Sequence, residues 1–432
     1  LLFFLEVKNM KILLRNSLLR YIIISFTTLI VSASSVYAAE VSILAVWGGD
    51  EEAGFRELLN GFTAETGIAV NYEGDRDVQE VVKQRLAGGN PPDIAIIPRP
   101  GEIAALAKAG ALVPLPDLID ENYINENYGK GMVDLGIHYG VFYALPVKAI
   151  SKSTVWYKPQ SFNDLGVEIP DTWDELMAIT DKYNAAGKTP WAMGGRDGWT
   201  LTDWFENIYV RVAGPEKYHQ LFVTHELEWT DASVVEAMGY FRQIVDPESN
   251  ILGGGEGSIS TGFIEGMDNM LLDKAEMYYE GGFMGGIAKA NFPDLTCGED
   301  YAWFTFPSIK PEYGKGIVVG GDFAVVFNDN PDVRAFMKYL AGEKGNTAWA
   351  SAPKGSVISV NKNVPLSVYS PCIAKEAGDL GAASIAVFDG SDMATPAVGG
   401  DAMFVGLQDF VAEPDSVNDV LEFIEDAADN SY

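Results

Sequence analysis

Residues 41–67 read VSILAVWGGDEEAGFRELLNGFTAETG, and this pattern predicts a strand, a turn and a helix in immediate succession. Residues 41–47 are mostly apolar, as expected of a buried strand. The two glycines that follow permit a tight turn, and the three consecutive acids after them favour a helix N-terminus. Apolar residues then recur at helical spacing until the glycine at 67, which marks the helix end.

The same alternation continues over the next fifty residues. Short apolar runs such as PPDIAIIP (91–98) alternate with amphipathic segments such as GEIAALAKAGAL (101–112). Repeated strand–helix–strand units predict an α/β domain whose sheet is parallel, with helices on both faces. The further elements expected here are a strand at 68–74 and a helix at 78–89.

The alternation of strands and helices returns late in the chain. A mostly helical stretch follows residue 145 and runs to about residue 245, but GIVVGGDFAVVF (316–327) again has the pattern of a buried strand followed by a helix. This return indicates that the chain revisits the first domain. Nearly 400 residues are more than one hydrophobic core usually holds, so two domains are expected.

The N-terminal residues have the pattern of a secretory signal peptide. After Met10 come three basic residues, an apolar run at 21–31 and small residues at 36–39, with cleavage expected after Ala38. The apolar run is shorter than the roughly 20 residues of a membrane-spanning helix. The expected cleavage site is not followed directly by a cysteine, to which a lipid would be attached. We therefore expect export to the periplasm without a lipid anchor.

Composition excludes several classes of function. The formal net charge of −31 opposes binding to nucleic acid, which needs cations to neutralise phosphates. The three histidines show no metal-ligand spacing, so no metal and no cofactor are expected. Cys297 and Cys372 could form a disulfide in an oxidising compartment, but spacing alone does not establish that they do.

Aromatic and acidic residues gather in several separate segments. RDGWTLTDWFENIY (196–209) holds Trp199 and Trp204, MYYEGGFMGG (277–286) holds Glu280 and Phe283, and Trp47 ends the first strand just before the acids. Ligands of open α/β sheets bind at the carboxyl ends of strands, where Trp47 is expected. A pyranose stacks its C–H face on an aromatic ring and donates its hydroxyls to carboxylates, so this combination favours a sugar ligand.

Two other functions remain open from the residues alone. Catalytic motifs such as GxSxG, HExxH or a P-loop do not occur, and no catalytic residue is expected, but the many acids leave room for the carboxylate pair of an exported glycoside hydrolase. The adjacent Tyr278 and Tyr279 allow a ferric-iron-binding protein, a less favoured alternative because no histidine lies near this motif.

The chain resembles the extracellular solute-binding proteins of ABC sugar importers, the group that includes maltose- and α-glucoside-binding proteins. The resemblance spans nearly the whole chain after the signal segment, and its specificity lies in the order and spacing of its pieces. These are FTAETGIAV (62–70), PPDIAIIP (91–98), LAKAGALVPL (106–115), GVFYALPVKAI (140–150), PDTWDELMAITDKYNAAGKTPWAMGG (170–195), MYYEGGF (277–283), GGDFAVVFNDNPDVRAFMKYLAG (320–342) and SAPKGSVISVNK (351–362).

The resemblance implies a two-lobed periplasmic binding protein fold of type II, with a hinge between the lobes and the ligand in the cleft. The first lobe is expected to hold residues 40–149 and 318–362, and the second 150–317 and 363–432. Residues 1–39 form the signal segment and what precedes it.

The resemblance also carries ligand contacts onto particular positions. The Phe at 283 stands where the family more often has Trp, which leaves the size of the ligand open. The ligand-binding residues expected are Trp47, Asp50, Glu51, Arg99, Trp199, Trp204, Glu280, Phe283, Asp322 and Lys354.

The implied function is a receptor without enzymatic activity. It would deliver a neutral sugar or oligosaccharide, such as an α-glucoside, to the membrane permease of an ABC transporter. We expect a monomer whose lobes close over the sugar.

Overall fold

The computed structural model describes residues 40–354 and 357–432. The predicted signal peptide lies outside these residues. Residues 41–432 form one compact unit. Within the described residues, no helix combines the length and the apolarity that crossing a bilayer requires.

Six strands form the first sheet, in the order β12-β11-β3-β1-β2, with β6 paired to β11. β1 and β3 are parallel, which confirms the arrangement predicted for the first strands. The sheet as a whole is mixed, because β11 runs antiparallel to β3 and to β6. Its strands are β1 (Glu40–Ala45), β2 (Ala69–Gly74), β3 (Ile94–Ile97), β6 (Ala144–Ser151), β11 (Ile317–Val326) and β12 (Ala386–Phe388).

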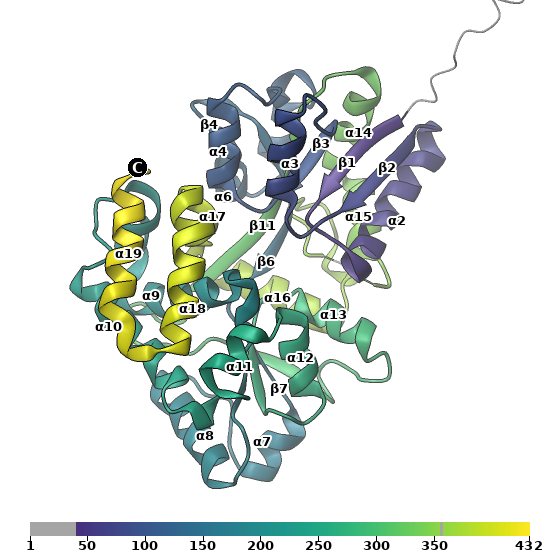
Figure 1. Cartoon of the computed structure of the whole chain (residues 1–432). Helices are drawn as coiled ribbons and strands as arrows, with labels where there is room; N and C mark the ends of the chain where they lie inside the picture. The colour runs from purple at the N-terminus through teal and green to yellow at the C-terminus, as the bar shows by residue number, and fades with distance from the viewer. Residues whose placement is uncertain (1–39, 355–356) are drawn as a thin grey trace, which may run out of the picture. The chain divides into compact units, whose positions relative to one another are not determined.

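Helices cover both faces of this sheet, and apolar clusters fill the space on each side (Figure 1). Phe55 and Phe62 of α2 pack into one of these clusters, as the helical spacing of the sequence predicts. The helices of this lobe are α2 (Gly49–Thr66), α3 (Val78–Ala87), α4 (Pro100–Lys108), α5 (Glu121–Asn127), α6 (Lys130–Asp134), α14 (Pro331–Ala341) and α15 (Glu343–Ala350), and a hairpin of β4 (Ile137–His138) and β5 (Val141–Phe142) completes it.

The second sheet has the order β10-β7-β9-β8. β7 is antiparallel to both β10 and β9, and β8 is parallel to β9. The strands are β7 (Thr154–Tyr157), β8 (Trp191–Ala192), β9 (Met277–Tyr279) and β10 (Ala302–Thr305). The helices of this part are α7 (Pro159–Leu165), α8 (Trp173–Ala185), α9 (Trp199–His219), α10 (Ala232–Val245), α11 (Gly254–Ser260), α12 (Phe263–Leu271) and α13 (Met284–Asn291).

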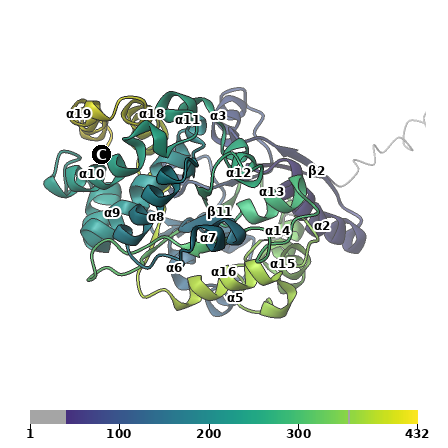
Figure 2. The same cartoon turned by 90° about the horizontal axis from the view of Figure 1, so that it is seen from below.

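The C-terminal segment contacts helices of the second sheet's region and also adds a strand to the first sheet. α18 packs against α9, α11 and α19, and Figure 2 shows α18 between α19 and α11. β12, in contrast, pairs with β11 of the first sheet, although residues 363–432 are assigned to the second lobe from sequence. The lobe boundaries therefore stay a prediction. The helices are α16 (Pro371–Ala382), α17 (Gly390–Met393), α18 (Met403–Ala412) and α19 (Val417–Asp429).

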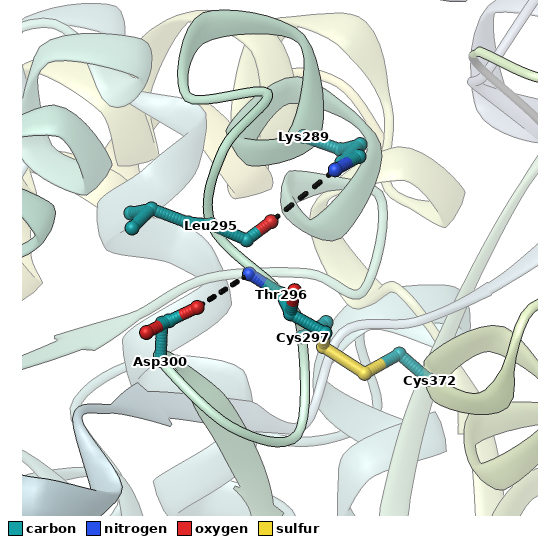
Figure 3. Close-up of a disulfide and its surroundings, with 6 residues drawn as sticks. All are labelled: Lys289, Leu295, Thr296, Cys297, Asp300 and Cys372. Carbon is teal, nitrogen blue, oxygen red and sulfur yellow. Dashed lines mark hydrogen bonds between the residues drawn. A yellow bond between two sulfur atoms is a disulfide. The ribbon is translucent and has the colours of Figure 1, made fainter.

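Cys297 and Cys372 form a disulfide, with their Cα atoms 6.3 Å apart (Figure 3). Cys372 lies at the start of α16, and Cys297 lies in the loop between α13 and β10. This loop is held locally by Asp300, whose carboxylate accepts the Thr296 N–H at 2.7 Å. The disulfide therefore joins the start of α16 to the loop that leads into β10 of the second sheet. The sequence alone had left open whether these two cysteines pair.

Candidate functional site

A cavity of about 560 Å³ opens between residues that follow the strands of the first sheet and residues of the α9–α13 region. We refer to it as the cleft. Its volume falls within the range of about 300–1,000 Å³ that is usual for small-molecule sites. The lining residues used below are Trp47, Glu51, Arg76, Arg99, Lys148, Ile150, Lys152, Trp199, Phe263, Phe283, Asp322, Asp392 and Phe404.

One wall of the cleft is built around Lys148. Its Nζ lies 3.2 Å from Glu51 Oε1 and 3.0 Å from Asp322 Oδ2. Pairing of β6 with β11 sets Lys148 opposite Asp322, and the glycine turn after β1 brings Glu51 at the start of α2 to the same point. Trp47 Nε1 donates to Asp322 Oδ2 at 2.8 Å.

The charges of this wall neutralise one another. Burial alone would raise the pKa of Glu51, but the nearby Lys148 and Arg76 bring that pKa below its usual value. Burial would likewise lower the pKa of Lys148, and the attraction of Asp322 and Glu51 raises it instead. The wall therefore presents ionised groups whose charges are already matched.

A second wall of the cleft is organised by Lys152, which directly follows β6. Its Nζ is bound to Asp203 Oδ1 at 3.1 Å and to Asp389 Oδ2, and lies 3.9 Å from Asp392 Oδ2. Burial opposes the charge on Lys152, but these three carboxylates raise its pKa well above the usual value. The same Nζ lies 5.4 Å from the ring centroid of Trp199, which connects the buried charges to the cleft surface.

Aromatic rings supply the apolar part of the cleft. Trp199 is half-buried and meets Phe263 edge-on, with centroids 5.2 Å apart. The ring centroids of Phe283 and Trp199 lie 6.0 Å apart. The guanidinium carbon of Arg99 lies over the Phe404 ring, 5.0 Å from its centroid. Trp199, Phe283 and Phe404 are half-buried, and they lie beside the hydrogen-bonding groups of both walls, as stacking of a sugar ring requires.

Six of the predicted ligand residues come together in the cleft. They are Trp47, Glu51, Arg99, Trp199, Phe283 and Asp322. Trp47 lines the cleft from within the first core, since only 1% of its surface is exposed. Their roles in binding remain predictions.

The other predicted ligand residues lie elsewhere. Trp204 is a core residue, stacked on Phe241 and packed against Tyr279. Glu280 is fully buried behind the cleft. Lys354 lines a different cavity of about 490 Å³, beside the disulfide. Asp50 lies in the first turn of α2, and its side chain is outside what the structure describes.

Sequence reasoning missed the two lysines that organise the cleft walls. Lys148, Ile150 and Lys152 alternate along β6 and its end, and all three line the cleft. Residues two apart on a strand share a face, so the alternation in PVKAISK was a usable signal. Arg76 and Asp392 were also missed, because they reach the cleft only through contacts distant in sequence, with Glu51 and with Arg99.

The tyrosine pair of the ferric-iron alternative faces the core. Tyr278 donates its hydroxyl to the Phe263 carbonyl at 2.7 Å, and Tyr279 donates to the Lys152 carbonyl at 2.7 Å and the Asp203 carbonyl at 2.9 Å. Burial raises the pKa of both phenols well above the usual value. Phenolate ligands for iron are therefore not presented here, and the structure gives the iron alternative no support.

The amino-acid sequence matches a known protein family. Residues 48–347 match the family model described as bacterial extracellular solute-binding protein. The chain belongs to this family. Its members are solute-binding receptors rather than enzymes, and they act outside the cytoplasm.

Two relatives of this bacterial extracellular solute-binding protein match it over most of their length. It is 35% identical over 393 residues to the osmoprotective compounds-binding protein GgtB of Synechocystis sp., a match covering 89% of this chain and 91% of the relative. It is 32% identical over 395 residues to the alpha-glucosides-binding periplasmic protein AglE of Rhizobium meliloti, covering 88% and 84%.

Solved structures confirm the two-lobed α/β fold. The bacterial solute receptor AcbH, described as having an exclusive preference for β-D-galactopyranose, superposes with a TM-score of 0.81 at 19% identity, covering 91% of this chain and 99% of that one. A chitin oligosaccharide binding protein superposes with a TM-score of 0.80 at 21% identity, with the same coverage.

Proposed function

We propose that this chain is the periplasmic receptor of an ABC importer and that its cleft binds a neutral sugar or short oligosaccharide, such as an α-glucoside. The observation that carries this is the composition of the cleft. Half-buried aromatic rings stand beside carboxylates and cations that are already paired with one another.

The pairing of charges in the two walls favours a neutral ligand over a charged one. An anionic or cationic solute would need an opposite charge left unmatched in the site. Lys148 instead lies between Glu51 and Asp322, and Arg99 Nε lies 3.3 Å from Asp392 Oδ1. Hydroxyl groups can both donate and accept, so a polyol can bind to such pairs without breaking them.

The names of the relatives agree with this chemistry. GgtB is named for osmoprotective compounds, AglE for alpha-glucosides, and AcbH and the chitin oligosaccharide receptor for carbohydrates. We propose the same class of ligand for the present chain. We also propose that it is exported through a cleaved signal peptide without a lipid anchor, is a monomer and docks on a membrane permease.

A ligand screen tests the proposal. We expect at least one of maltose, trehalose, sucrose, an α-glucoside or a xyloside to raise the melting temperature of the purified protein, because a ligand that binds only the folded state stabilises it by mass action. Chromatography of the same mixtures should show the sugar unchanged after prolonged incubation. Release of hydrolysis products at a rate that falls on substitution of a cleft carboxylate would instead support the glycoside hydrolase alternative.

A further inference from the structure

Two carboxyl groups face each other directly behind the cleft wall. Asp203 lies on α9 and Glu280 follows β9, and both side chains are fully buried. Burial raises the pKa of both groups, and the charge of Glu280 raises the pKa of Asp203 further, so the two groups interact directly. Neither group lines the cleft, so a role for this pair has to act through another residue.

An account of their four oxygens leaves two without a donor. Asp203 Oδ1 accepts from Lys152 at 3.1 Å, and Glu280 Oε1 accepts the Gly281 N–H at 2.9 Å. Asp203 Oδ2 and Glu280 Oε2 have no donor, and they are the only carboxylate oxygens in that condition among the buried atoms of the described residues. A single proton on either group makes an O–H···O bond that satisfies both oxygens, whereas two ionised carboxylates would repel each other.

Burial and the carboxylates around the pair favour keeping this proton. Glu206 and Asp389 already receive their own donors, from the N–H groups of Gly390 and Ser391 and from Lys152. Lys152 is therefore shared among several carboxylates and cannot neutralise them all. Burial is the main cause that raises the pKa of Glu280, to about 8. The titratable groups around the pair are Lys152, Asp197, Glu206, Tyr278, Tyr279 and Asp389.

Lys152 connects the pair to the cleft. Asp203 Oδ1 accepts a hydrogen bond from Lys152 Nζ, while Oδ2 of the same carboxyl is the oxygen without a donor. Lys152 Nζ also lies over the ring of Trp199. We propose that Asp203 and Glu280 share one proton at neutral pH and that this proton holds Lys152 and Trp199 in their positions in the cleft wall. Above neutral pH the proton leaves to solvent, and repulsion between the two carboxylates displaces the Asp203–Lys152 contact.

The shared proton is tested without any ligand. A carboxyl whose pKa is raised in the folded state contributes stability that is present below the unfolded pKa of about 4.5 and is lost as pH rises through about 8. We expect the folding equilibrium constant of the ligand-free protein to fall by about tenfold more between pH 7 and 9 than that of Glu280→Gln. The glutamine amide donates to Asp203 Oδ2 at every pH and so replaces the protonated carboxyl.

Glu276→Gln is the matched control, because Glu276 is a buried glutamate that directly precedes β9, as Glu280 directly follows it, and it is paired with Lys188 at 3.0 Å. Its denaturation curves should keep the parent's loss of stability between pH 7 and 9. If the parent and Glu280→Gln lose stability equally over this range, the two carboxyls do not share a proton and the inference is overturned.

The effect on the cleft rests on the proposed function and needs a second readout. We expect the affinity of the parent for maltose to fall by up to about tenfold from pH 7 to 9, and that of Glu280→Gln to stay constant. Equal pH dependence in both proteins would overturn the link through Lys152. If maltose binds neither protein at either pH while the ligand-free difference is present, the shared proton stands and the assignment of an α-glucoside ligand fails.

Discussion

Lys152→Met is expected to lower the free energy of unfolding by about 3–5 kcal/mol at pH 7.5, the usual cost of removing one partner from a buried ion pair. Three carboxylates, those of Asp203, Asp389 and Asp392, lose their shared cation, and all three are at least nine-tenths buried. Urea denaturation followed by circular dichroism measures the change.

The pH dependence of this loss distinguishes lost charge from lost packing. Without Lys152 the pKa values of the three carboxyls rise in the folded state, so stability is retained at low pH and lost as pH rises. The deficit should therefore be smaller at pH 5 than at pH 7.5. Lys130→Met is the control, since Lys130 forms a surface pair with Asp134 and its side chain is 85% exposed; its stability should barely change. A deficit for Lys152→Met below about 1 kcal/mol at pH 7.5 would contradict the account.

Trp47→Ala is expected to destabilise the ligand-free protein by about 3–5 kcal/mol, the range for removing a large aromatic from a core. The indole packs edge-on against Phe55 and Trp349, with centroids 5.1 and 4.8 Å away. Its Nε1 also holds Asp322 in place beside Lys148. The residue thus supports the cleft wall from inside the core. Calorimetry of the ligand-free variant measures the loss.

Trp47→Phe separates packing from the hydrogen bond. It keeps an aromatic ring against Phe55 and Trp349 but cannot donate to Asp322, so a smaller loss of stability is expected than for alanine. An unchanged melting temperature for Trp47→Ala, combined with a collapse in sugar affinity, would show that the ring is a stacking platform rather than a core residue.

Much of the fold was predictable from local sequence pattern. The strand–turn–helix at 41–67 and the buried strand at 316–327 follow from apolar spacing, and β1, α2 and β11 form there. The antiparallel course of β11 was not predictable, because it depends on which edge of the sheet the returning chain meets.

The candidate site was predictable where a residue lies in the turn or the first helical turn after a strand. Glu51 and Arg99 stand after β1 and β3 and reach the cleft. Trp204 and Glu280 shared the same aromatic and acidic signal, but their burial is decided by packing between segments far apart in sequence, such as Trp204 on Phe241. Composition of a short segment does not report which side of a helix faces the core.

The most direct test of the central claim is an isothermal titration of the parent protein and Trp199→Ala with the sugar that gives the largest thermal shift. Trp199 is a half-buried ring that lines the cleft, and truncating an aromatic hot spot costs roughly 2 kcal/mol or more, which corresponds to about a twentyfold loss of affinity. Phe423→Ala, at an aromatic residue of α19 that is 47% exposed, should leave the affinity unchanged. We predict one-to-one binding of a neutral sugar, weakened at least twentyfold by Trp199→Ala while the protein stays folded. Equal affinity of the parent and a folded Trp199→Ala, or binding of charged solutes alone, would contradict the account.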